Sequence, residues 1–184
     1  AEQDGTDIDD PRLGRSMLYT SGTTGRPKGV HRAEVPPTSG LGKLFGYEPR
    51  ETMHLCTGPV YHAAPLAFSL AGPLNAGVGV VLMDGWSPAE TLRLIEEHQI
   101  THSHMVPTMF HRLLSLPDEV RGDYDTSSLT HVLHGAAPCP VPVKRRIIEW
   151  LGPIVVEYYA ATEGVGSFVD SETWLAHPGT VGRP

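Results

Sequence analysis

The sequence predicts an α/β fold in which a mainly parallel sheet is flanked by helices. First, short apolar segments with strand character alternate with helical segments at least three times between residues 52 and 161. Such alternation is typical of βαβ units with right-handed crossovers. Second, segments rich in glycine, hydroxyl and other small residues follow predicted strands at 20–28, 135–138 and 159–163. Because ligands bind at the carboxyl ends of parallel strands, we expect these three segments to share one site.

The predicted elements follow one another with short connections. A strand over 16–20 enters a glycine-rich loop, and the prolines and glycines of 31–50 indicate irregular structure with a short helix. The later predicted strands are 52–60, 78–84, 101–106, 129–137 and 154–161, and the predicted helices are 63–77, 87–100, 107–116 and 141–152.

Two of these segments carry expectations about burial. The continuous apolar run at 78–84 is typical of a parallel strand covered on both faces, and the helix at 63–77 is apolar nearly all round. Both segments are therefore expected in the interior.

Two helices have clearer signatures. The helix at 87–100 has Ser87 as its cap, a proline at its first position and Glu90 in a capping box, with two apolar side chains facing the core, Leu92 and Ile95. The helix at 141–152 is expected to bury Ile147, Ile148 and Leu151 and to turn its basic residues outward.

Composition bounds the function. The 184 residues suit one domain, with 40% hydrophobic and 19% charged residues and no apolar run long enough to span a membrane. The net charge of −7 comes mostly from five acids in the first ten residues, so residues 1–15 read as an acidic, flexible lead-in and a nucleic-acid-binding face is not expected. Two distant cysteines, Cys56 and Cys139, favour a reduced, cytoplasmic setting.

The segment "TSGTTGRPKGV" at 20–30 has the chemistry of a phosphate loop. Its glycines allow close approach of backbone N–H groups, its hydroxyls donate hydrogen bonds, and Lys28 supplies a cation. The spacing matches neither a Walker A loop nor a dinucleotide fingerprint, which excludes the P-loop kinase and Rossmann types. A flexible surface turn is the alternative for a loop of this composition.

One family combines these features. The stretch "YTSGTTGRPKGV" (19–30) resembles the signature loop of the adenylate-forming superfamily, which includes acyl-CoA ligases, luciferases and peptide-synthetase adenylation domains. Further segments resemble that family in its own order, namely "GPVYHAAP" (58–65), "MVPTMFHRLL" (105–114), "HGAAPCP" (134–140), "YAATEG" (159–164) and "PGTVGRP" (178–184). The resemblance covers about residues 16–184 and implies one subdomain of the acyl-CoA synthetase N-terminal domain.

The resemblance also implies roles for individual residues. Lys28, Thr162 and Glu163 take the positions of catalytic residues, with Glu163 as the Mg²⁺ ligand. The implied nucleotide-binding residues are Thr20, Ser21, Gly22, Thr23, Thr24, Gly25, Lys28, Gly135, Ala136, Ala137, Glu157, Tyr158, Tyr159 and Thr162. The implied substrate-binding residues are His62, Ala64 and Gly135. For His62, a structural histidine in the core is the alternative.

Some residues depart from the family's pattern. Ala160 stands where glycine is usual. The resemblance implies that Tyr159 stacks on the adenine, and Glu157 and Tyr158 stand where polar and glycine residues often precede that tyrosine. No aspartate follows His62, as it does in members that bind an α-amino group, and this favours a simple carboxylic acid over an amino acid. His102 and His104 share a strand face, but without a third ligand at metal spacing they do not predict a metal site.

The resemblance implies ATP-dependent formation of an acyl-adenylate from a fatty or other apolar acid and its transfer to coenzyme A. It implies ATP, Mg²⁺, coenzyme A and a small carboxylic acid as cofactors and partners. We expect 16–184 to be a partial domain without the lid domain that carries the family's catalytic lysine, and so to have little turnover alone. Two alternatives remain, an amino-acid adenylation domain and a nucleotide-binding module without catalysis.

Overall fold

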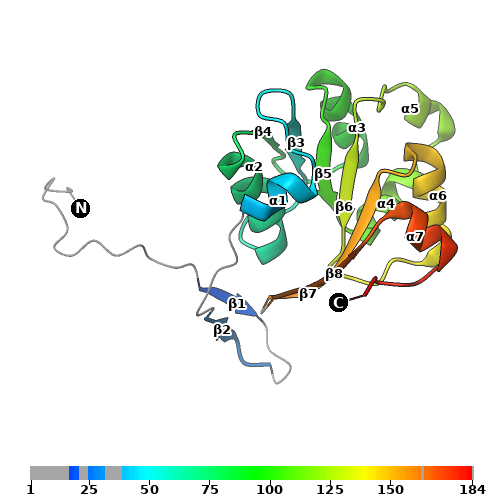
Figure 1. Cartoon of the computed structure of the whole chain (residues 1–184). Coiled ribbons are helices and arrows are strands. Elements are labelled where there is room, and N and C mark those ends of the chain that lie inside the picture. The colour runs from blue at the N-terminus through cyan, green and yellow to red at the C-terminus, as the bar shows by residue number, and fades with distance from the viewer. Residues whose placement is uncertain (1–16, 21–24, 32–38, 163, 184) are drawn as a thin grey trace, which may run out of the picture.

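A six-stranded sheet forms the centre of the protein in a computed structural model that describes residues 17–20, 25–31, 39–162 and 164–183 (Figure 1). Its strands lie in the order β4-β3-β5-β6-β7-β8. They are β3 (Met53–Cys56), β4 (Gly79–Leu82), β5 (His102–Met105), β6 (His131–His134), β7 (Val155–Ala161) and β8 (Gly164–Val169). All neighbours pair in parallel except β7 and β8, which are antiparallel. The α/β class and the mainly parallel sheet are thereby confirmed.

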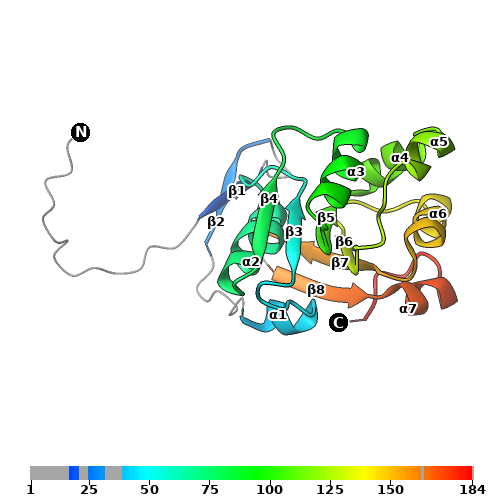
Figure 2. The same cartoon turned by 90° about the horizontal axis from the view of Figure 1, so that it is seen from above.

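Helices cover both faces of this sheet. They are α1 (Ser39–Leu44), the π-helix η1 (Pro65–Ala71), α2 (Gly72–Asn75), α3 (Pro88–Glu97), α4 (Pro107–Leu114), α5 (Asp118–Gly122), α6 (Val141–Leu151) and α7 (Ser171–Ala176). Figure 2 shows α3, α4 and α6 on one side of the sheet and α1 and α2 on the other. The protein is therefore a three-layer arrangement around one sheet.

The two faces hold separate apolar clusters. The larger cluster joins one strand face to α3, α4, α6 and α7, and its fully buried members include Leu55, Ile95, Phe110 and Ile147. The smaller cluster, on the opposite face, consists of Phe45, Phe68, Leu133 and Tyr158. Because successive strand residues point to opposite faces, β6 contributes Val132 to the first cluster and Leu133 to the second.

The expectation for the run at 78–84 was wrong. β4 is the edge strand of the sheet, next to β3 alone, and its residues are only half-buried. Leu82 is 58% exposed. The apolar run therefore marks a strand, but it does not mark a central one.

The apolar helix expected over 63–77 forms, but with two geometries. It begins as η1, a π-helix in which Phe68 and Ser69 are buried, and it continues as α2, where Leu74 is 56% exposed. π-helices are rare and frequently lie at functional sites. The expectation of burial all round was therefore wrong for the second half.

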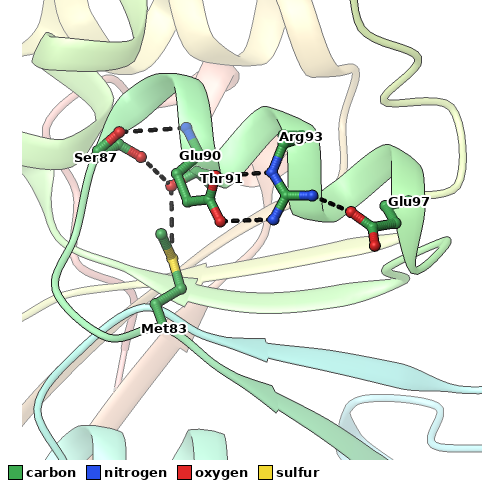
Figure 3. Close-up of polar contacts among 6 residues, drawn as sticks. All are labelled: Met83, Ser87, Glu90, Thr91, Arg93 and Glu97. Carbon is green, nitrogen blue, oxygen red and sulfur yellow. Dashed lines mark hydrogen bonds and ion pairs between the residues drawn. The ribbon is translucent and has the colours of Figure 1, made fainter.

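The helix expected at 87–100 is α3, and its cap is confirmed. The Ser87 side chain accepts a hydrogen bond from the backbone N–H of Glu90 at 3.2 Å (Figure 3). In a full capping box the Glu90 carboxylate would accept from the backbone N–H of Ser87. Here it accepts from the Arg93 guanidinium instead and forms an ion pair within the helix. Leu92 and Ile95 face the core as expected.

The first predicted strand lies outside the main sheet. β1 (Leu18–Thr20) pairs only with β2 (Lys28–Val30) in a two-stranded antiparallel sheet. The segment 20–28 is thus the connection of a hairpin and does not end a strand of the central sheet. β2, α5 (Asp118–Gly122), β8 and α7 were not predicted, because each is six residues or shorter and has no continuous apolar run.

Candidate functional site

The expected ligand-binding segments gather at one end of the sheet. Figure 1 shows β5, β6 and β7 running toward the end of the molecule where the β1–β2 hairpin also lies. Residues 135–138 follow β6, and Thr162 follows the last residue of β7. The carboxyl ends of the parallel strands and the hairpin therefore face the same region, which is where open α/β sheets bind ligands.

The hairpin fixes the two ends of the expected phosphate loop. Thr20 is paired with Lys28 across the two strands, so the loop between them begins and ends at one point. Lys28 is exposed, and Gly25 has a φ of 78°, a conformation that favours glycine. The expected contacts of Ser21, Gly22, Thr23 and Thr24 lie outside the described residues.

The segment after β6 combines close packing with an exposed surface. A Cβ on Gly135 would lie 2.6 Å from the Tyr158 ring and 2.7 Å from the Tyr158 carbonyl oxygen, so only glycine fits there. Ala136 has a φ of 68°, which is uncommon for a residue with a side chain, and both Ala136 and Ala137 are exposed. The backbone here is accessible and has no large side chain to shield it.

The end of β7 presents one aromatic ring to solvent. Tyr159 is 63% exposed, at a register shift between Tyr159 and Ala160 in the β7–β8 pairing. Such irregularities redirect side chains and are frequent beside functional sites. Tyr159 thus lies within β7, inside the strand expected over 154–161. Thr162 is half-buried, and Glu163 lies outside the described residues.

Two other expected nucleotide-binding residues point into the interior. Tyr158 is buried, and its hydroxyl lies 3.1 Å from Nε2 of His104. Burial raises the pKa of Tyr158 to about 12. Glu157 is also buried, and its Oε2 lies 2.5 Å from Nζ of Lys144. Their side chains already have interior partners.

Lys144 is the residue that sequence reasoning placed on the wrong side of its helix. It is completely buried in α6, because it shares one helical face with Ile147, Ile148 and Leu151. The spacing i, i+3, i+4 and i+7 was therefore the signal that could have found it. The exposed basic residues of α6 are Arg145 and Arg146 alone.

The expected acid-binding residues lie just before η1. His62 is exposed, so the alternative of a core histidine is wrong, and its ring lies 4.7 Å from that of Tyr61. Ala64 packs against the smaller apolar cluster, which includes Tyr158. Tyr158, a member of that cluster, also lies against Gly135.

His102 and His104 belong to the interior of the sheet. Nε2 of His102 lies 2.7 Å from the Phe45 carbonyl oxygen, and burial lowers the pKa of both histidines to about 4. Over the part of the chain that the structure describes, no group of three or more His, Cys, Asp or Glu side chains could hold a metal ion. Within the same residues, no helix has the length and apolar character needed to cross a membrane.

Comparison with known proteins gives a consistent set of relatives. The chain is 32% identical over 173 residues to a probable CoA ligase of Humulus lupulus, covering 91% of this chain and 31% of that protein. It is 37% identical over 149 residues to a medium/long-chain-fatty-acid–CoA ligase of Mycobacterium tuberculosis, covering 80% of this chain and 25% of that protein.

A solved structure extends this similarity to the fold. The o-succinylbenzoate CoA synthetase of Bacillus subtilis, in complex with ATP and magnesium ion, is 26% identical with a TM-score of 0.72, covering 91% of this chain and 35% of that one. The chain thus spans between 25% and 35% of the length of these three relatives. A family model for AMP-binding enzymes matches residues 6–184. With the fold, the family model and the relatives in agreement, the chain belongs to the AMP-binding enzyme family.

Proposed function

We propose that this chain supplies the nucleotide- and acid-binding elements of an AMP-forming acid–CoA ligase acting on an apolar carboxylic acid. The observation that carries the proposal is the meeting of three chemically distinct segments at one end of the sheet. These are the hairpin with Lys28, the small-residue segment after β6 and the exposed Tyr159 of β7.

Each segment suits a different part of ATP. The Tyr159 ring can stack on adenine, and the exposed backbone at Ala136 and Ala137 leaves room for a flat base beside it. Lys28 carries a mobile cation for the terminal phosphates. Thr162 is assigned to the α-phosphate, where the reaction takes place.

The proposed reaction has two steps. A carboxylate oxygen of the acid bonds to the α-phosphorus of ATP as the bond to the bridging oxygen breaks, and pyrophosphate leaves with that electron pair. The sulfur of coenzyme A then bonds to the acyl carbon, AMP leaves, and the thiol proton passes to solvent. Because a carboxylate is already ionised at pH 7, the protein needs to align anions and offset their charge more than to remove a proton.

Magnesium is assigned to the phosphate oxygens, where it would neutralise negative charge. Glu163, its expected ligand, lies outside the described residues, and no step above depends on the metal. The o-succinylbenzoate CoA synthetase that resembles this chain was solved with ATP and magnesium ion. For this chain the magnesium site stays a prediction.

An apolar acid is favoured by the surroundings of the expected acid site. The exposed His62 can meet a carboxylate, and the adjoining η1 and Ala64 belong to apolar surroundings. Two relatives in the comparison are fatty-acid–CoA ligases, one from Mycobacterium tuberculosis and one from Bacillus subtilis.

The first test is acid-dependent pyrophosphate exchange by the protein that carries this chain. Exchange is expected with medium- and long-chain fatty acids and not with amino acids, because no aspartate follows His62 to bind an α-amino group. Exchange that depends on an amino acid would instead make this an amino-acid adenylation domain. Binding of Mg·ATP without exchange for any acid would make it a nucleotide-binding module.

The second test removes the loop cation. Lys28→Ala is expected to raise the dissociation constant of Mg·ATP about tenfold or more, because a charge-assisted contact to phosphate is lost. Lys43→Ala, on the exposed end of α1, is the matched control and should leave ATP binding unchanged. Equal ATP affinity in wild type and Lys28→Ala, measured by calorimetry, would contradict the assignment of the loop. Glu163→Ala is expected to weaken Mg·ATP binding in the same assay.

A further inference from the structure

A buried ion pair lies close in sequence to the proposed nucleotide-binding segments, because Glu157 comes two residues before Tyr159 and is paired with His134. Lys144 Nζ is 2.5 Å from Glu157 Oε2, and the two side chains are 0% and 7% exposed. Burial lowers the pKa of Lys144, and the contact with the Glu157 carboxylate opposes that shift. The pair is thus an ammonium and a carboxylate held together away from water.

The pair sits at a structurally particular position. Glu157 is paired with His134, and this is the last register position between β6 and β7. One residue after His134 comes Gly135, where the small-residue segment begins. Two residues after Glu157 comes Tyr159, where the β7–β8 register shifts. The end of the β6–β7 pairing and the shift in the β7–β8 register therefore both lie within a few residues of the ion pair.

Lys144 connects three elements through one charged group. It projects from α6, it contacts Glu157 of β7, and its ammonium lies 4.7 Å from the centre of the Trp174 ring in α7. A carboxylate and an aromatic face both attract a cation, and the strength of each interaction depends on where the cation lies relative to the group. The contact therefore fixes α6 and α7 relative to β7 in a way that apolar packing alone does not.

Stability is a poor explanation for such a pair. Taking two charges out of water costs several kcal/mol per ion, and well-packed apolar replacements of buried ion pairs are often as stable as the pair itself. What the pair adds is a fixed distance and direction between α6 and the end of β7. Glu157 lies close in sequence to Tyr159, in one of the two segments whose alignment ATP binding requires.

We propose that Lys144 and Glu157 are a positioning pair that aligns the segment after β6 with Tyr159 of β7 for the adenine of ATP. The inference rests on the proposed function, because it assumes that these two segments bind the nucleotide. Neither residue touches ATP in this proposal. Both act through the backbone that they hold in register.

His134 gives the proposal a signature that depends on pH. Its Nε2 lies 3.7 Å from Glu157 Oε2, and neither ring nitrogen has a hydrogen-bond partner among the described residues. Burial first, and then the charges of Lys144 and His104, hold the pKa of His134 well below its usual range. The titratable or charged groups around it are Glu157 on β7, Lys144 on α6 and His104 on β5, while α4 presents the uncharged Phe110 ring. Cys139 in turn lies near Glu157 and Lys144.

Removing the ammonium should make His134 the partner of Glu157. In Lys144→Met, the repulsion from the ammonium is gone and the carboxylate is left unpaired, so His134 takes up a proton more readily. Its positive charge would then partly replace that of Lys144 at low pH. In the wild-type protein His134 does not become the partner of Glu157, because the Lys144 ammonium already pairs with that carboxylate.

The experiment measures the dissociation constant of Mg·ATP and the melting temperature of Lys144→Met, Glu157→Gln and the apolar double variant Lys144→Met/Glu157→Leu. Each variant is expected to bind Mg·ATP about tenfold more weakly, because a small misplacement of binding groups is costly. The double variant should regain the melting temperature of wild type without regaining its affinity. Arg145→Met, an exposed change on the same helix, is the control.

The outcomes separate this inference from the proposed function. Wild-type protein that fails to bind Mg·ATP would refute the proposed function. Wild-type binding together with unchanged affinity in the folded variants would overturn the positioning pair alone, as would a double variant that regains both stability and affinity. The dissociation constant of Mg·ATP for Lys144→Met, divided by that for wild type, should decrease as the pH is lowered from 8 to 6. A ratio independent of pH would also overturn the proposal.

Discussion

Two adjacent tyrosines on β7 have opposite environments, and this difference decides which of them can meet a ligand. Tyr158 is 5% exposed and lies among Phe68, His104 and Gly135, whereas Tyr159 is 63% exposed. Alternation along a strand separates their faces, and the register shift after Tyr159 opens its side to solvent. Tyr159 is therefore the residue to test for contact with adenine.

Tyr159→Ala is expected to weaken binding of Mg·ATP by about 1 to 3 kcal/mol, the range found for stacking of a base on an aromatic ring. Tyr159→Phe keeps the ring and should bind ATP nearly as wild type does. Because the side chain is exposed, the melting temperature should change little in either variant. Calorimetric titration measures the affinities, and equal losses for alanine and phenylalanine would refute stacking.

Gly135→Ala is expected to destabilise the protein by about 1 to 3 kcal/mol, as overpacking typically does. The added methyl group would meet both the ring and the carbonyl oxygen of Tyr158, and the carbonyl cannot rotate away. Gly122→Ala at the end of α5 is the control, because its added methyl would meet nothing within 4 Å. Urea denaturation measures both, and a Gly135→Ala protein as stable as the control would show that the segment can shift without cost.

At the scale of a single element, α3 shows which surface contacts stabilise a helix. Ser87→Ala is expected to lower the free energy of unfolding by about 1 kcal/mol, because the Glu90 N–H loses its acceptor. Arg93→Ala removes ion pairs to Glu90 and Glu97 but should have the smaller effect, since all three side chains are exposed (Figure 3). Urea denaturation compares the two, and a larger loss for Arg93→Ala would reverse this ranking.

At the scale of the whole molecule, histidines link neighbouring strands across one face of the sheet. His54, His102 and His131 occupy adjacent register positions on β3, β5 and β6, and the rings of His102 and His131 stack 4.6 Å apart. Burial lowers the pKa of His54 to about 3 and those of His102 and His104 to about 4. The side chains of His54, His102 and His104 are therefore neutral in the folded protein near pH 7.

This arrangement predicts acid sensitivity. Below about pH 6.5 the unfolded chain binds protons that the folded protein excludes, so the stability due to the neutral histidines is complete above pH 6.5 and falls as the pH approaches 4. The expected loss is on the order of 1 to 2 kcal/mol per buried histidine at pH 5.

Thermal unfolding between pH 7 and pH 4.5 measures this loss. His104→Gln should reduce the slope of melting temperature against pH, whereas His111→Gln, exposed on α4, should not. Identical slopes in wild type and His104→Gln would contradict the role of this histidine.

Much of the architecture could be read from local patterns. The order of strands and longer helices from β3 to β7, without the short α5, depends on residues close together in the sequence, as do the cap of α3 and the position of the expected ligand-binding segments. The signals are side-chain periodicity, capping hydroxyls and glycine-rich connections. These signals are local because a turn or a strand face is decided within a few residues. The resemblance at 19–30 and 159–164 is a local signal of the same kind.

Other features depended on contacts that no short segment contains. Whether β4 lies at the edge of the sheet, and whether β1 joins it at all, depends on which strands pair, and pairing joins distant residues. The spacing within α6 puts Lys144 on the buried face, but its counter-charge is Glu157, thirteen residues away, and only folding brings the two together. The sequence by itself determined the fold class, the element order and the family resemblance, since these follow from local periodicity and spacing. Only the tertiary structure decided which charged and aromatic side chains are buried, because burial of a polar group depends on a partner that folding brings to it.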